Sequence, residues 1–205
     1  MTVPNQKTQS SYINCYSKIL GTVMTPISKE AALKFCELCN WAYEVWVTHK
    51  FLFDENKNPE ANIGKSKYFT SRLSIITQEY GLLQVAKLHD PAILRSSINL
   101  TIEYLVRFGD WGSKEMAIKK LESNLSDLWQ YLKLARNKAL AHNDLLTLMK
   151  NDTLGAFPQG TDDKYFEVLQ AFVNEVHEKW IGGPYPFNDL AIVDVQEFID
   201  LIQRC

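Results

Sequence analysis

Apolar residues recur at three- and four-residue steps along most of the chain, and this spacing is typical of amphipathic α-helices. The pattern predicts helices over residues 10–24, 29–53, 66–88, 98–107, 114–142, 161–180 and 189–203. Polar segments with glycine or proline separate them, and no convincing run of alternating residues predicts strands. The predicted fold class is therefore all-α, a helical bundle of about six to seven helices with an up-and-down core and extra C-terminal helices.

Particular residues mark where some of these helices begin and end. Ser28 stands where an N-cap belongs, just before the second predicted helix. The third predicted helix ends sharply at Leu88, because Asp90, the residue before Pro91, avoids helical geometry. Residues 29–53 are apolar over more than half of the helix circumference, which indicates a central helix or part of a subunit interface.

Length and composition limit the domain organisation and the class of protein. The 205 residues can bury one sizeable core, so we expect a single helical domain over residues 1–205, with residues 1–9 disordered and residues 145–160 forming an irregular connector. The net charge of −2 excludes a bulk attraction to nucleic acid or anionic lipid, so RNA contact would need a local basic patch. No transmembrane run or signal-peptide pattern is present, which predicts a cytoplasmic protein without membrane contact.

Cys36 and Cys39 form a Cys-x-x-Cys, a spacing that redox and zinc sites use. The chain has no second such pair or histidine pair to complete four zinc ligands, and the segment has a helical pattern. Core packing of two small side chains on one helix face is therefore favoured over a metal or redox role. We expect neither a metal site nor a cofactor.

The end of the helix predicted over residues 114–142 holds the main candidates for catalytic and binding residues. The apolar stripe of this helix continues to His142, and Arg136, Asn137 and Lys138 add a polar cluster. Such a cluster would be costly inside a core unless every donor had a partner. Solvated Arg136 and Lys138 near the helix C-terminus, with Asn143 ending the helix in a left-handed turn, would explain it without a function.

Two motifs carry a family resemblance. Residues 136–144 read Arg-Asn-Lys-x-x-x-His-x-Asp, which resembles the Arg-Asp-Lys-x-x-x-His-x-Asp signature of the AbiU2-like branch of the HEPN superfamily. Residues 87–92 and 97–101 resemble the helix-ending Asp-Pro and Asn-Leu-Ser/Thr segments of the same branch. The motifs have the family's order and separation, and the resemblance covers about residues 27–177.

The resemblance implies a HEPN-like helical domain that pairs into a homodimer, with Arg and His of both subunits lining a cleft that cleaves RNA without metal. Carried onto this chain, the catalytic candidates are Arg136 as phosphate clamp, His142 as acid or base, and Asn137 as the neighbour that orients phosphate or histidine. The chemistry suits these residues, since histidine titrates near neutral pH and a guanidinium stays charged.

Lys133, Lys138 and Asp144 are the substrate-binding candidates. Lys133 and Arg136 lie three residues apart and would form one basic ridge with Lys138 nearby, although a solvated face of mixed charge is an equal alternative. Six helical steps separate Arg136 from His142, which places the two side chains roughly 120° apart. This spacing favours a site composed across a dimer axis.

The remaining histidines show less chemistry in the sequence. His89 precedes the Asp-Pro of a helix end, which is typical of a capping or packing histidine. His49 and His177 lie in aromatic-rich helices and have no evident partner.

Two functional hypotheses follow. The first is a HEPN-type metal-independent endoribonuclease that acts in phage defence (abortive infection) or as a toxin. The second is a non-catalytic HEPN-like dimer that binds a nucleotide, RNA or a protein partner. In the second, Arg136, His142 and Asp144 would hydrogen-bond across the interface. Expected partners are a second copy of the chain, RNA, and an antitoxin or other regulatory protein.

Overall fold

The computed structural model describes residues 27–55, 67–95, 97–135 and 160–204. Its α-helices are α2 (Lys29–His49), α4 (Lys67–Leu88), α5 (Ile102–Phe108), α6 (Glu115–Ala135), α8 (Thr161–Trp180) and α9 (Leu190–Gln203). A π-helical turn, η1 (Lys50–Asp54), extends α2, and a 3-10 turn, η3 (Gly112–Lys114), precedes α6. The all-α fold class is confirmed. The predicted helix over residues 10–24 and most of the predicted connector over residues 145–160 lie outside the described residues.

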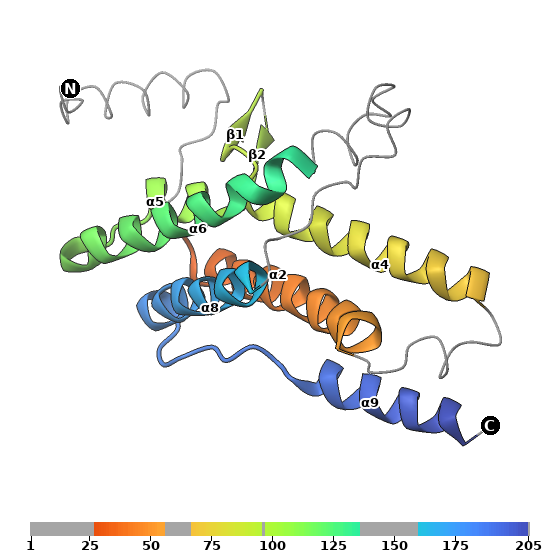
Figure 1. Cartoon of the computed structure of the whole chain (residues 1–205). Coiled ribbons are helices and arrows are strands. Elements are labelled where there is room, and N and C mark those ends of the chain that lie inside the picture. The colour runs from red at the N-terminus through yellow and green to blue at the C-terminus, as the bar shows by residue number, and fades with distance from the viewer. Residues whose placement is uncertain (1–26, 56–66, 96, 136–159, 205) are drawn as a thin grey trace.

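Helices α2, α4, α6 and α8 form the bundle (Figure 1). α2 packs against both α4 and α8, and α8 packs in turn against α6. The order of colours in Figure 1 shows that successive bundle helices run in opposite directions, as predicted for an up-and-down core. α9 packs outside the bundle, on α2 and η1. No described helix has the length and apolar character needed to cross a membrane.

The core is built from apolar stripes of the bundle helices. Phe35 of α2 meets Phe172 of α8 edge to face, with ring centroids 5.8 Å apart. Cys36 and Cys39 lie in the same core and are fully buried. Burial raises the pKa of Cys36 to about 12 and raises the pKa of Cys39 well above its usual value. Both thiols stay protonated and act as small apolar groups, which confirms the core-packing interpretation of the Cys-x-x-Cys.

Ser28 caps α2 as predicted, since its hydroxyl accepts a hydrogen bond from the Ala31 N–H at 3.0 Å. The helix predicted over residues 98–107 begins later than expected. A short antiparallel hairpin, β1 (Ile93–Leu94) with β2 (Ser97–Ile98), ends at the residue predicted to begin that helix, and α5 begins only at Ile102. Thr101 is extended and caps α5 by accepting from the Tyr104 N–H. The helical spacing of apolar residues continued through the hairpin, so periodicity alone placed the boundary wrongly.

Gly109 ends α5 where no larger residue fits. A Cβ atom there would lie 2.5 Å from the Leu105 carbonyl oxygen and 2.6 Å from the Trp111 indole nitrogen. That indole N–H donates to the same Leu105 oxygen at 3.0 Å, and the Trp111 side chain is buried. The glycine therefore lets the chain turn tightly from α5 into α6.

We expect the core of α8 to carry much of the folding stability. Leu169 of α8 is 0% exposed, so Leu169→Ala should lower the free energy of unfolding by about 2–5 kcal/mol through lost contacts and a residual cavity. Leu201→Ala on α9 is the matched control, because that leucine is 61% exposed and its removal should change stability by no more than about 0.5 kcal/mol. Urea unfolding followed by circular dichroism measures both. Equal losses would contradict this account of the core.

Candidate functional site

Lys133 is the one candidate residue that the structure describes. The other five follow α6 in the sequence and lie outside the described residues: Arg136, Asn137, Lys138, His142 and Asp144. Lys133 is exposed on the last turn of α6 and lines a cavity of about 470 Å³. The structure thus shows the surroundings of the helix that leads into the Arg-Asn-Lys motif.

This cavity, called the α6 cavity below, brings the second motif next to Lys133. One wall comes from α6, where Glu122, Ser126, Trp129 and Lys133 follow one another at three- and four-residue steps. The opposite wall comes from the end of α4, the turn after it and the start of α5: Ala86, His89, Asp90, Pro91, Ile102 and Glu103. Residues 87–92 and the end of α6, far apart in the sequence, therefore meet at one site.

The Asp-Pro turn of the second motif is held by hydrogen bonds to α5 and to the hairpin. The Ala92 N–H donates to Glu103 Oε2 at 3.0 Å. Asn99 donates its side-chain N–H to the Pro91 carbonyl and its backbone N–H to the Ala92 carbonyl, both at 2.8 Å. These bonds give the motif residues a structural role, because they set the wall that faces α6.

His89 is a packing histidine that also lines the α6 cavity. Its ring stacks on Trp129 with centroids 4.9 Å apart and planes 4° from parallel. Its Nε2 lies 2.9 Å from the Tyr165 hydroxyl of α8. Burial lowers the pKa of His89 to about 3. The ring is therefore neutral near pH 7, where it can exchange hydrogen bonds with a ligand but does not supply an imidazolium proton.

The charges around Lys133 are mixed. Asp90, Glu103 and Glu122 line the α6 cavity with it, and the pKa of Glu122 is raised by burial and by the charge of Glu103. This wall alone is poorly suited to a phosphate, so phosphate recognition would depend on Lys133 together with residues after Ala135. Within the described residues, no three or more His, Cys, Asp and Glu side chains gather in an arrangement that could hold a metal ion.

Two other histidines have partners that the sequence did not reveal. His177 Nδ1 lies 2.8 Å from the Gly183 carbonyl oxygen and fastens the turn after α8. His49 Nδ1 lies 2.9 Å from the Thr77 hydroxyl of α4. The His49 contact joins residues on two helices, and no local pattern could have indicated it. His49 also lines a second cavity, which lies against Leu132 of α6.

A family model described as AbiU2, of the HEPN type, matches residues 27–200. The matched range contains both motifs, the four bundle helices and most of α9. No curated protein and no solved structure matches the chain.

We expect His89 to make folding stability depend on pH. Its pKa is about 3 in the folded protein and about 6.5 when unfolded, so between these values the unfolded chain binds the additional proton. Stability from this residue is therefore lost as the pH falls, by about 2 kcal/mol between pH 7 and pH 5. His89→Gln should reduce that difference by about the same amount, measured by urea unfolding at both pH values. Burial also lowers the pKa of His49, so the His89→Gln protein should still lose some stability as the pH falls. A His89→Gln protein with the wild-type pH dependence would contradict this assignment.

Proposed function

Because the chain belongs to the AbiU2 family of HEPN proteins, we propose that it is a metal-independent endoribonuclease that acts at the cleft of a homodimer. The observation that carries this proposal is the family match over residues 27–200, which includes the complete Arg-Asn-Lys-x-x-x-His-x-Asp motif. The meeting of the second motif with the end of α6 supports it, because Lys133, a substrate-binding candidate, lines the same cavity as His89, Asp90 and Pro91. The proposed role is abortive infection in phage defence or toxicity, in the cytoplasm and without a cofactor.

In the proposed reaction, a ribose 2′-hydroxyl attacks the neighbouring phosphorus and the bond to the 5′-oxygen of the next nucleotide breaks. His142 takes the hydroxyl proton, and His142 of the partner subunit gives a proton to the leaving oxygen. Arg136 holds the phosphate oxygens and offsets the charge gained in the transition state. Asn137 orients the phosphate or the histidine, and Lys138 and Asp144 contact the flanking RNA.

Lys133 is proposed to bind a phosphate beside the cleaved one. It is exposed, stands three residues before Arg136, and belongs to the last described turn of α6. A lysine acts there as a point charge, so its loss should weaken RNA binding more than the chemical step.

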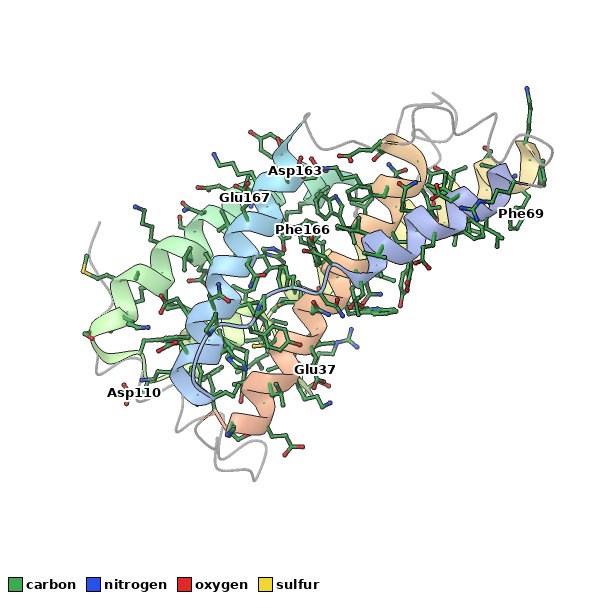
Figure 2. All side chains as sticks on the ribbon, turned by 90° about the horizontal axis from the view of Figure 1, so that it is seen from below. Glu37, Phe69, Asp110, Asp163, Phe166 and Glu167 are labelled. Carbon is green, nitrogen blue, oxygen red and sulfur yellow. The ribbon has the colours of Figure 1, made fainter. Side chains whose placement is uncertain are left out.

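The proposed dimer interface is an apolar face of α2 and α4, called the α2–α4 face below. Its residues are Leu38, Trp41, Phe69, Ile76, Tyr80 and Leu83, and all are exposed. On α4 the members lie within about 60° of one another around the helix. The Trp41 indole N–H donates to the Tyr80 hydroxyl at 3.3 Å, which joins the stripes of the two helices. Figure 2 labels Phe69 at the outer end of α4.

The extent and the charge of this face suit a second copy of the chain. Phe69 is 62% exposed, Ile76 60% and Trp41 47%, and a whole aromatic side chain offers about 150–250 Å². The six residues together present roughly 500–600 Å² of apolar surface, most of the about 800 Å² that each partner buries in a standard interface. Lys34 and Glu37 on α2, which pair with each other at 2.6 Å, and Arg72 on α4 place both signs of charge near this face, so a second copy would not meet a surface of one sign.

The acidic residues around Lys133 support the alternative hypothesis, a non-catalytic dimer. Asp90, Glu103 and Glu122 would repel an RNA backbone at this position. In that case the protein is a non-catalytic HEPN-like dimer that binds a nucleotide, an RNA or a protein such as an antitoxin. Arg136, His142 and Asp144 then stabilise the dimer by hydrogen bonds.

The cleavage experiment uses end-labelled total RNA with EDTA present. We expect the wild type to cut and both Arg136→Ala and His142→Ala to lose at least about a hundredfold in rate, since each removes a group that acts in the transition state. Lys133→Ala should raise KM several-fold with kcat nearly unchanged. Lys119→Ala is the control, because Lys119 is exposed on the same helix and paired with Glu115 at 2.6 Å. If the variants cut as well as the wild type, the nuclease assignment fails, and loss of the dimer in inactive variants would favour the alternative.

The interface experiment measures the molecular mass in solution by light scattering. Ile76→Asp should convert the dimer to monomers, because a buried unpaired carboxylate is strongly unfavourable at an interface. Met116→Asp on α6 is the control, since Met116 is 85% exposed and lies outside the α2–α4 face. A monomeric wild type, or an Ile76→Asp protein that remains dimeric, would overturn the proposed interface.

A further inference from the structure

A second cavity of about 460 Å³, called the α2–α8 cavity below, adjoins the end of α6 through Leu132. It lies among the end of α2, η1, the middle of α4 and the start of α8. Figure 2 shows Phe166 on α8 lying toward α2, with Asp163 on the first turn of α8. Its floor is apolar and includes Leu82, Val85, Leu132 and Phe166. A cavity of this size with an apolar floor and polar rim is typical of small-molecule sites.

The charges on the rim exclude an anionic ligand. Four carboxylates line the cavity, two from the end of η1 and two from α8: Asp54, Glu55, Asp162 and Asp163. Among the described lining residues Lys50 is the one ammonium, and those from α4 and α6 are all neutral. A phosphate here would meet more repulsion than attraction, whereas a cation would be attracted.

Lys50 shows how this wall holds an ammonium group. Its Nζ lies 4.8 Å from the centre of the Trp46 ring, donates to Asp163 and lies 3.3 Å from Glu55. The Lys50 side chain is only 15% exposed. A ring face and carboxylates together therefore stabilise a largely desolvated cation within the cavity wall. Since Glu55 and Asp163 already pair with Lys50, a cationic ligand would bind at the part of the rim formed by His49 and Asp54.

At that part of the rim, His49 presents a bare nitrogen. Thr77 Oγ lies 2.9 Å from the Leu73 carbonyl oxygen and 3.1 Å from that of Ser74, so the hydroxyl donates its single hydrogen within α4. In the tautomer that we assign to His49, Thr77 Oγ then accepts from His49 Nδ1–H, 2.9 Å away. Burial lowers the pKa of His49 despite the nearby Asp54 charge, so the ring is neutral near pH 7 and its Nε2 carries a lone pair.

The π-helical turn η1 brings a second acceptor beside this nitrogen. It places Asp54 Oδ2 3.9 Å from His49 Nε2, too far for a direct hydrogen bond. His49 is buried, with a residue exposure of 8%, whereas the Asp54 side chain is open to solvent. Two acceptors this close leave a place for a donor with two N–H groups. π-helical turns occur frequently at functional sites.

We propose that the α2–α8 cavity binds a small organic cation whose ammonium or guanidinium group donates to both His49 Nε2 and the Asp54 carboxylate. The alkyl part of such a ligand, as in a linear polyamine or an arginine-like molecule, lies on the floor formed by Leu82, Val85 and Leu132. This site does not include Lys133, the one proposed RNA-binding residue that the structure describes, and a bound ligand would touch Leu132 on the last turns of α6. A nucleobase with N–H donors is disfavoured, since its attached phosphates would approach the four carboxylates.

The test is isothermal titration calorimetry of the full-length wild type with agmatine and with putrescine at pH 7.5 and low salt. We expect one site per chain, with affinity at least about tenfold weaker in Asp54→Asn and in His49→Gln. Asp54→Asn should fold normally, because its side chain is 64% exposed and the change keeps its shape. Asp110→Asn is the matched control, since Asp110 is exposed and lies far from Asp163 in Figure 2. It should bind like the wild type.

The outcomes separate this proposal from the nuclease. Equal affinity of the wild type, Asp54→Asn and Asp110→Asn would mean general attraction to an acidic surface and would overturn the site. Absence of binding at millimolar ligand would overturn it as well. If guanosine binds but neither amine does, and Asp54→Asn abolishes guanosine binding, the cavity is a nucleobase site and the proposal of a cation site is overturned. Because the readout is direct binding, failure of RNA cleavage leaves the result unaffected.

Discussion

Burial of the apolar stripe of α8 between α2 and α6 is the constraint on which the rest of the structure depends. Leu169, Phe172, Val173 and Val176 are all fully buried, so α8 must have a helix on each side. This packing fixes the distance between the start of α8 and the end of α6, which both line the α2–α8 cavity, and it also holds α6, which forms one wall of the α6 cavity. Removal of α8 contacts would therefore affect the candidate sites as well as stability.

His89 joins three helices at the place where the Asp-Pro motif meets the last described turns of α6. It follows the end of α4, stacks on Trp129 of α6 and contacts the Tyr165 hydroxyl of α8. A neutral histidine suits this role, because it packs like an aromatic ring while satisfying a buried hydroxyl. Glu103 and Asn99 hold the Asp-Pro turn that follows by hydrogen bonds to its backbone. Residues 87–92, the Asp-Pro motif, therefore have a structural role.

Both cavities at the end of α6 have predominantly acidic walls. In the proposed nuclease, phosphate recognition therefore rests on Lys133 and on the basic residues that follow it in sequence, Arg136 and Lys138. The acidic α2–α8 cavity instead suits a cationic ligand. The carboxylates of the α2–α8 cavity would repel an RNA phosphate and attract a small cation.

Sequence alone determined the all-α class, the long bundle helices, the Ser28 cap and the packing role of Cys36 and Cys39, because periodicity and capping are local properties. It also placed the family, which the family model match over residues 27–200 confirms. It missed the hairpin at residues 93–98, since strand pairing depends on a partner segment. Only the tertiary structure decided that Lys133 and His89 line one cavity and that Asp54 lies close to His49 at the edge of another. Those contacts join residues on different helices or across a π-helical turn, and no sequence period encodes them.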